Sequence, residues 1–141
     1  TVYWLMGNAG DRFACMVAHC GVFHLESMTL ATEEQWFTNW DLGAPWWEVE
    51  GGEAPMRRFS PHRFVGNWKT PLLVIHGEQD FRVPYDQGLQ AFTAAQVRGV
   101  PSRLVVFPDE GHWILKPQDG VLWQREFFGW LDRWCKPQGG K

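Results

Sequence analysis

The segment Thr70–Pro84, which reads TPLLVIHGEQDFRVP, constrains the fold of this chain more than any other stretch. Its apolar run Leu72–Ile75 does not alternate with polar residues, and it lies between Pro71 and Gly77. Such a run is typical of a strand buried on both faces, as in a parallel sheet covered by helices. Ligands and catalytic groups gather at the carboxyl ends of strands in these sheets. Asp80, in the polar loop after this strand, is therefore expected at a functional edge.

A second strand and loop repeat this arrangement further along the chain. Ser102–Pro108 is rich in β-branched and apolar residues and leads into a loop that carries His112. Between the two strands, Asp86–Arg98 has the apolar spacing of a helix and ends at Gly99. An α/β-hydrolase presents the acid and base of its catalytic triad in this order of strand, loop, helix, strand and loop. The sequence thus predicts an α/β fold with a mostly parallel sheet flanked by helices.

The composition narrows the class of protein. A chain of 141 residues with 45% hydrophobic and 21% charged residues is ordinary for one soluble globular domain. The net charge of −3 predicts no basic surface, so nucleic acid is not an expected partner. No stretch approaches the ~18 apolar residues that a membrane span needs, and no charged-then-apolar leader opens the chain. Cys15, Cys20 and Cys135 lack metal-ligand spacing and are expected to be buried or idle thiols.

The rest of the chain is expected to form short elements around these two strands, with no internal repeat. In order, they are the end of a helix (Thr1–Asn8), a strand (Phe13–Val22), a loop (Phe23–Met28), a helix with Thr32 as its N-cap (Thr32–Leu42), an irregular stretch (Asp41–Pro55), a short helix or turn (Ser60–Trp68) and a final helix (Gly120–Trp134).

Short motifs run through nearly the whole chain: Gly21-Val22-Phe23, Ser60-Pro61, Thr70-Pro71, His76-Gly77-Glu78, Asp80-Phe81-Arg82-Val83-Pro84, Arg98-Gly99-Val100-Pro101-Ser102, Phe107-Pro108-Asp109-Glu110, His112-Trp113 and Trp123-Gln124-Arg125. With these motifs in this order, the chain resembles the C-terminal part of the catalytic domain of the prolyl oligopeptidase family of serine peptidases. The dipeptidyl-peptidase and acylaminoacyl-peptidase branches are the nearest. The resemblance implies an α/β-hydrolase domain, usually joined to an upstream β-propeller that restricts entry to short peptides.

The resemblance also implies roles for four residues of the Asp80 and His112 loops. Asp80 matches the triad acid and His112 the triad base, which is physically reasonable because a base imidazole needs a carboxylate to fix its tautomer. The alternatives are a turn-forming aspartate and a solvated loop histidine. Arg82 matches an arginine that binds a substrate backbone carbonyl, with a surface ion pair as the alternative. Val83 matches an apolar wall of the pocket for the residue before the cleaved bond.

Two tryptophans are further candidates for this pocket. Trp36 and Trp40 are four residues apart and therefore share one face of the expected helix. They lie where the family often places pocket aromatics, although ordinary packing is the alternative. Four other histidines are expected to be structural: His19, His24, His62 and His76. Asp109 and Glu110 are expected to shape the loop that carries His112.

The sequence contains no nucleophile in a suitable context. The family carries its serine on a G-x-S-x-G elbow, whereas Ser27, Ser60 and Ser102 have no such surroundings. The resemblance places the nucleophile just upstream of Thr1. Residues 1–141 are accordingly predicted to be a partial α/β-hydrolase domain that lacks the N-terminal strands and the elbow, and the isolated chain is expected to be inactive.

Three functional hypotheses follow. The first is a fragment of a serine peptidase that cleaves short peptides through a Ser-Asp-His acyl-enzyme. The second is a carboxylesterase of similar fold that acts on small esters, and the third is a non-catalytic hydrolase remnant. The expected partners are a short peptide and the missing N-terminal part of the same protein, with oligomers left open. No metal or organic cofactor is implied, and a soluble protein of the cytoplasm or periplasm is expected.

Overall fold

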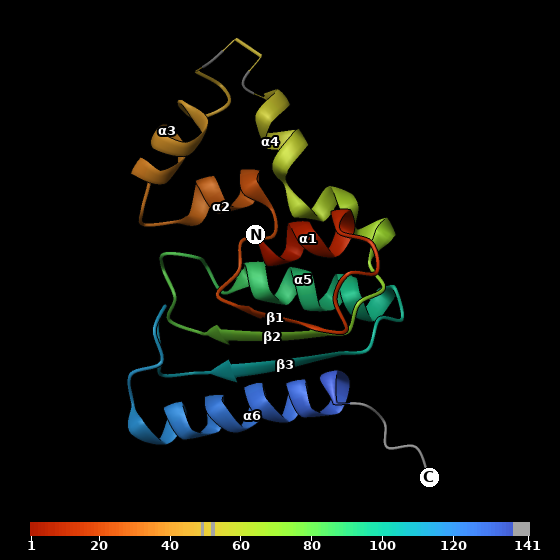
Figure 1. The fold of residues 1–141 in the computed structure, drawn as a ribbon. Coiled ribbons are helices and arrows are strands. Elements are labelled where there is room, and N and C mark those ends of the chain that lie inside the picture. Colours follow the sequence, from red (N-terminus) through yellow and green to blue (C-terminus); the bar gives the residue numbers. More distant parts are fainter. Residues whose placement is uncertain (49, 52, 137–141) are drawn as a thin grey trace.

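A parallel sheet lies at the centre of the computed structural model, which describes residues 1–48, 50–51 and 53–136. Its strands are β1 (Met16–His19), β2 (Leu72–Gly77) and β3 (Ser102–Phe107), in the order β1-β2-β3 (Figure 1). Every residue of β2 is buried because this strand has a neighbour on each side and helices on both faces. The predicted α/β fold is confirmed, and the uninterrupted apolar run is the central strand.

The register brings the carboxyl ends of the strands to one edge of the sheet. His19 lies opposite Ile75, and Gly77 lies opposite Phe107. The loops that follow the three strands therefore begin side by side, although they are far apart in the sequence. The predicted Asp80 and His112 loops are two of these three loops.

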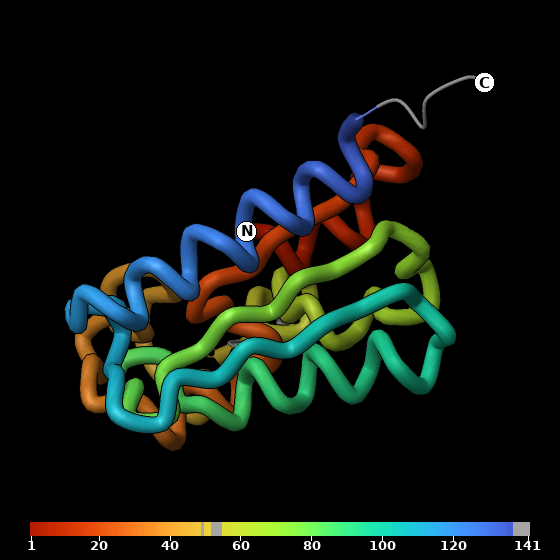
Figure 2. Tube along the Cα trace, turned by 90° about the horizontal axis from the view of Figure 1, so that it is seen from below, coloured from red at the N-terminus to blue at the C-terminus, as the bar shows by residue number. Residues whose placement is uncertain are grey.

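Helices form one layer on each face of the sheet, as Figures 1 and 2 show. Helices α1 (Val2–Asn8) and α5 (Asp86–Val97) cover one face together with the 3-10 helix η1 (Pro61–Asn67), and α6 (Pro117–Cys135) covers the other. Because side chains of a strand alternate between its faces, β2 divides its residues between two cores. Leu72 and Val74 pack towards α1 and α5, whereas Leu73 and Ile75 pack towards Trp130 of α6.

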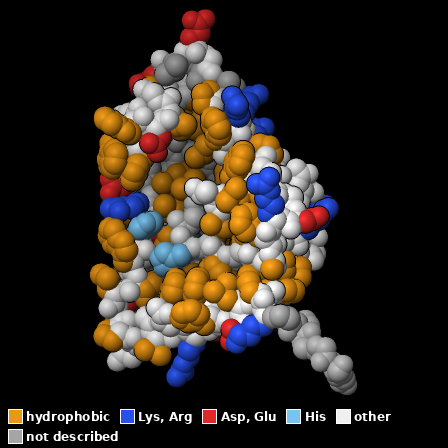
Figure 3. All heavy atoms as spheres, viewed as in Figure 1, with side chains coloured by type: hydrophobic (Ala, Val, Ile, Leu, Met, Phe, Trp, Pro, Cys, Tyr) orange, Lys and Arg blue, Asp and Glu red, His pale blue; other side chains and the backbone are white. Residues whose placement is uncertain are grey.

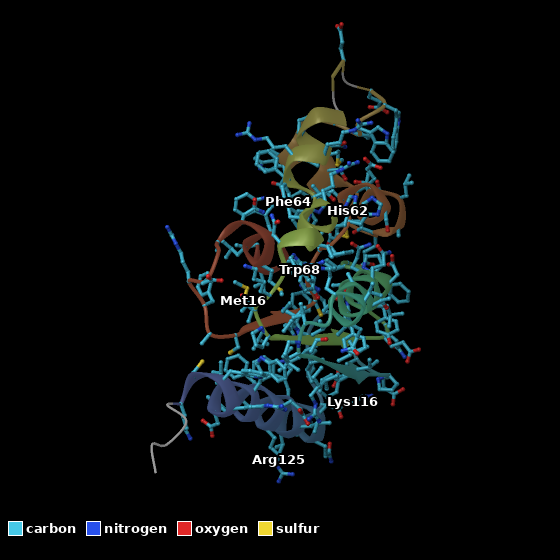
Figure 4. The ribbon with its side chains drawn as sticks, turned by 90° about the vertical axis from the view of Figure 1, so that its right-hand side faces the viewer. Met16, His62, Phe64, Trp68, Lys116 and Arg125 are labelled. Carbon is cyan, nitrogen blue, oxygen red and sulfur yellow. The ribbon has the colours of Figure 1, made fainter. Side chains whose placement is uncertain are left out.

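Aromatic side chains fill the layer between η1 and the sheet. Trp68 is 1% exposed, and its ring centroid lies 5.9 Å from that of Tyr3 and 5.7 Å from that of Phe23. In Figure 4, Trp68 lies closer to the strands than Phe64 and His62 do, whereas Arg125 points away from α6. These ring contacts hold α1, η1 and the chain after β1 in one core.

Three further helices project beyond the layer of α1 and α5 (Figure 1). They are α2 (Leu25–Ala31), α3 (Trp36–Leu42) and α4 (Glu53–Phe59). The expected loop at Phe23–Met28 is therefore wrong from Leu25 onward, and the stretch expected to be irregular ends in α4. Residues 49 and 52 of that stretch lie outside the described residues.

Thr32 does not cap α3, contrary to expectation. Its Oγ1 donates a hydrogen bond to the Arg82 carbonyl at 2.6 Å, and the Glu33 N–H donates to the Phe81 carbonyl at 2.8 Å. These contacts hold the chain in an extended conformation at Thr32, which ends α2, so that α3 begins four residues later. The same contacts tie the α2–α3 connection to the Asp80 loop.

Within the described ranges, no helix has the length and apolar content that crossing a bilayer requires.

Candidate active site

Asp80 lies on the loop after β2, with its side chain fully buried. Its Oδ1 accepts the N–H groups of Arg82 at 3.0 Å and Val83 at 2.9 Å, as in an aspartate-centred turn. Its Oδ2 accepts a hydrogen bond from Nδ1 of His112 at 2.8 Å. The turn and the contact with the histidine therefore use different oxygens, and one carboxylate serves both.

His112 lies on the loop after β3, and a quarter of its side chain (25%) is exposed. Because an ionised carboxylate only accepts hydrogen bonds, the proton between the two groups belongs to Nδ1 of the imidazole. This tautomer leaves the lone pair on Nε2, the atom that removes a proton in a general-base step. Asp80 and His112 thus have the geometry of the acid and base of a triad.

Close contact between the two loops depends on Gly77 at the end of β2. The Glu78 N–H donates to the Phe107 carbonyl at 2.9 Å, and the Gln79 N–H donates to the Glu110 carbonyl at 3.0 Å. A Cβ atom at Gly77 would collide with the carbonyl oxygens of Glu110 and Gly111. Only a glycine lets the histidine loop lie directly against the end of this strand.

His76, in β2, holds the Asp80 loop through a hydrogen bond to its backbone. It is completely buried, and its Nε2 donates a hydrogen bond to the Val83 carbonyl at 2.8 Å. Burial lowers the pKa of His76, which favours the neutral ring. The neutral ring does not compete for the charge of Asp80, although Nε2 lies 3.6 Å from Oδ2.

Cys20, His76 and Asp80 have potential metal-ligand atoms within 4.8 Å of one another. Hydrogen bonds already engage these atoms, because the Asp80 oxygens accept three N–H groups and His76 Nε2 donates to a carbonyl. Burial raises the pKa of the Cys20 thiol, whereas a metal ligand must be a thiolate. The donor set therefore fits support of the Asp80–His112 pair better than a metal ion.

A cavity of about 610 Å³ opens beside His112. In the space-filling view of Figure 3, hydrophobic side chains gather in a hollow, with histidine side chains beside it. The lining is mainly apolar and comes from the three projecting helices and the Asp80 loop; it includes Leu25, Met28, Phe37, Leu42, Phe59 and Val83. Thr32, Asp41 and Arg82 add polar groups.

Arg82 and Val83, the two residues of the Asp80 loop that the family resemblance linked to substrate binding, both line this cavity. The Nη2 atom of Arg82 donates to Oε1 of Glu34 at 2.9 Å, so the alternative of an ion pair also holds. The guanidinium lies 4.6 Å from the centre of the Trp113 ring. Glu34 and Trp113 together fix the arginine at the cavity wall.

The structure does not bring Trp36 and Trp40 into the cavity. Their exposed fractions are 53% and 83%, and neither is among the lining residues. The helix presents Phe37 instead, with the Trp36 ring stacked on it at 4.0 Å between centroids. The side of α3 that faces the cavity is therefore the side that carries Phe37.

The three serines of the chain have other roles. Ser60 is buried, and its Oγ lies 2.7 Å from His62 Nδ1 and accepts the Leu25 N–H at 2.9 Å. Ser27 donates to Asp86 Oδ2 at 3.2 Å. Ser102 begins β3, at the opposite edge of the sheet from the His112 loop. None of them has the position of a nucleophile for His112.

Comparisons with known proteins identify the family of this chain. A sequence profile described as the prolyl oligopeptidase family matches residues 1–138. The chain belongs to the prolyl oligopeptidase family. It is 54% identical over 138 residues to the dipeptidyl-peptidase 5 of Porphyromonas gingivalis, covering 96% of this chain and 20% of that protein.

A more distant relative belongs to the same named group of peptidases, and a solved structure shares the fold. The dipeptidyl-peptidase 5 of Schizosaccharomyces pombe is 38% identical over 136 residues, which cover 96% of this chain and 20% of that protein. The uncomplexed acylaminoacyl peptidase of Pyrococcus horikoshii has the same fold, with a TM-score of 0.82 at 20% identity, covering 99% of this chain and 23% of that chain. The chain thus spans about a fifth of the length of these family members.

Proposed function

We propose that this chain supplies the acid and the base of a serine peptidase, and that the nucleophilic serine belongs to a part of the protein outside this sequence. The observation that carries the proposal is the 2.8 Å hydrogen bond between Asp80 and His112 beside an apolar cavity. Membership of the prolyl oligopeptidase family supports it. Asp80 orients the ring, and His112 Nε2 is the base.

The chemistry follows from this assignment. Nε2 of His112 removes the proton of the serine hydroxyl as the oxygen attacks the peptide carbonyl, and Asp80 stabilises the resulting imidazolium. The same Nε2 then protonates the leaving amine, which yields an acyl-enzyme. Water, activated by His112 in turn, hydrolyses the acyl-enzyme and restores the serine.

The direction of α1 supports a nucleophile from the preceding part of the protein. Helix α1 runs opposite to the strands, so its first residue lies towards the edge that carries the Asp80 and His112 loops (Figure 1). A serine elbow sits between a strand and the start of such a helix. A segment preceding Thr1 would therefore enter at the edge where His112 is placed.

The cavity supports a short peptide substrate with an apolar side chain before the cleaved bond. Phe37, Leu42, Phe59 and Val83 offer an apolar wall, and Arg82, which also lines the cavity, offers a donor for a backbone carbonyl. The relatives named as dipeptidyl-peptidases favour a peptide over a small ester. Trp36 and Trp40 would contact such a substrate only if it reached beyond the cavity.

The decisive experiment replaces Asp80 by Asn in the full-length protein. The amide NH2 of the introduced Asn would donate to Nδ1 of His112 and hold the ring proton on Nε2, the wrong tautomer for a base, so kcat on a dipeptidyl chromogenic amide should fall by ~10⁴ with the fold intact by circular dichroism. Asp109→Asn is the matched control, because Asp109 lies on the histidine loop with 77% of its side chain exposed. This control should keep wild-type turnover. Turnover at the wild-type level in Asp80→Asn would remove Asp80 from the triad.

A further inference from the structure

The backbone of His112 is held from β1, independently of the contact between its ring and Asp80. Nε2 of His19 lies 3.0 Å from the His112 carbonyl oxygen. Sγ of Cys20 donates to the same oxygen at 3.5 Å. Both donors come from the carboxyl end of β1, where Cys20 has a φ of +47°, uncommon for a residue with a side chain. The chain turns there, and two consecutive side chains reach one carbonyl.

Trp123 of α6 determines which nitrogen of His19 carries the proton. Its Nε1–H donates to His19 Nδ1 at 3.1 Å. An indole nitrogen is only a donor, so Nδ1 must be the acceptor and Nε2 must hold the hydrogen. Nε2–H can then donate to the His112 carbonyl. Trp123, His19 and the His112 carbonyl thus form a chain of hydrogen bonds that crosses from α6 to the histidine loop.

This chain of hydrogen bonds requires a neutral His19. A proton on Nδ1 would face the indole N–H and break the first contact. Burial lowers the pKa of His19 and outweighs the hydrogen bond to the His112 carbonyl and the field of Asp80, which both raise it, while the nearby His112 ring adds to the lowering. The environment therefore preserves the tautomer that the geometry uses.

We infer that His19 is a positioning residue for His112, which holds the backbone of the catalytic base in place while Asp80 holds its ring. The inference rests on the proposed function, since it concerns the same base. Two anchors on opposite sides of the residue fix both the position and the direction of Nε2. A displacement of about 1 Å at a reacting group can cost ~10²-fold in rate, so the second anchor matters for turnover.

Two amide substitutions in the full-length protein separate the two contacts of His19. In His19→Gln, the amide nitrogen lies near the position of Nε2 and still reaches the His112 carbonyl. In His19→Asn, the shorter amide still accepts from Trp123 but falls short of the carbonyl. We expect His19→Asn to lower kcat by roughly 10-fold to 10²-fold with little change in KM, and His19→Gln to stay within about 3-fold of wild type.

Hydrogen exchange provides a readout that needs no activity. Backbone amides of residues 109–115 should exchange faster in His19→Asn than in His19→Gln, while those of β2 exchange alike in both variants. If His19→Asn does not fold, Trp123→Phe takes its place, because it removes the donor that fixes the tautomer and should speed exchange in the same segment.

The outcomes keep the two proposals apart. Equal kcat values for the Gln and Asn variants, or unchanged exchange at residues 109–115, would overturn the positioning role. A wild-type protein that does not cleave peptides would instead overturn the proposed function, and the exchange comparison would still decide whether His19 holds the histidine loop.

Discussion

Glu110 joins the histidine loop to the start of α6. Its carboxylate accepts the N–H of Lys116 at 2.7 Å and the N–H of Leu115 at 3.2 Å, and these donors lower its pKa below the ordinary value of 4.5. The sequence predicted that this residue shapes the loop. Its contacts show how, because they close the turn that follows His112.

The stability contributed by Glu110 should depend on pH. A depressed pKa means that the ionised carboxylate stabilises the fold above the unfolded-state value, and that this contribution is lost as the pH falls through the folded value. We expect Glu110→Gln to lower Tm at pH 7 and the difference from wild type to shrink below pH 4. Thermal scans at pH 7 and at a pH below 4 measure the difference in Tm between wild type and variant, with Asp109→Asn as the exposed control. A constant difference at every pH would contradict it.

Phe37 and Trp40 on α3 should differ in their effect on substrate binding. Phe37 lines the cavity, whereas Trp40 is 83% exposed. Phe37→Ala should raise KM for a peptide with an apolar side chain before the cleaved bond by roughly 10-fold or more, because it removes apolar contact area. Trp40→Ala should leave KM within about 2-fold. Steady-state kinetics of the full-length variants decides between them, and the reverse order would return the tryptophans to the pocket.

Individual residues differed in how well the sequence could predict them. Asp80 and His112 could be expected near each other because each lies in the loop after a strand, and parallel pairing brings such loops together. The tryptophan pair was not, since a spacing of four shows that two residues share a face but not what that face meets. His19 was expected to be structural only, because its contact with Trp123 depends on how α6 packs.

At the scale of elements, the central sheet was predictable and the projecting helices were not. An uninterrupted apolar run such as that of β2 indicates a strand buried on both faces, so this strand could be located from sequence alone. The bounds of α2 and α3 depend instead on tertiary hydrogen bonds from Thr32 and Glu33 to the Asp80 loop. Local capping rules cannot anticipate a cap residue that is engaged by a distant segment.

Gln87 at the start of α5 should be important for the stability of the β1–α2 connection. It is completely buried, and its Oε1 accepts the backbone N–H groups of Phe23 and His24. Gln87→Met keeps the shape but leaves both donors without an acceptor, at about 1–3 kcal/mol for each buried group. We expect a loss of roughly 2–4 kcal/mol in the free energy of unfolding.

Chemical denaturation of the full-length protein measures this loss. Gln90→Met is the matched control, since Gln90 lies one turn away in the same helix and its amide contacts only Asp86 among the described residues. The control should cost less than about 1 kcal/mol. Equal losses in the two variants would show that Gln87 does not hold the connection.

At the scale of the whole molecule, a thiol pair lies between the segment before β1 and the end of α6. Cys15, just before β1, and Cys135, the last residue of α6, have their Sγ atoms 3.6 Å apart. The sequence predicted buried or idle thiols because the three cysteines lack metal-ligand spacing, and it did not indicate that two residues 120 positions apart would meet. Burial and the neighbouring thiol raise the pKa of Cys15 to about 12, which disfavours its thiolate, and Cys135 is the exposed thiol of the pair.

A small disulfide oxidant, such as oxidised glutathione, should join these two cysteines. The Cys135 thiolate forms a mixed disulfide, and Cys15 then displaces the second glutathione thiol. Because the bond closes a long loop in the unfolded chain, we expect a stabilisation of up to about 4 kcal/mol and a higher Tm. Thiol titration and thermal scans of the full-length protein measure both effects, with Cys135→Ser as control. Two freely alkylated cysteines after oxidation would contradict this expectation.

The close approach at Gly77 has a consequence for descendants of this protein. A single methyl group there would force the two loops apart, so Asp80 and His112 would be separated without either being replaced. Lineages that keep the chemistry can therefore change position 77 only together with the path of residues 108–112. The requirement for glycine at position 77 thus restricts how the neighbouring histidine loop can evolve.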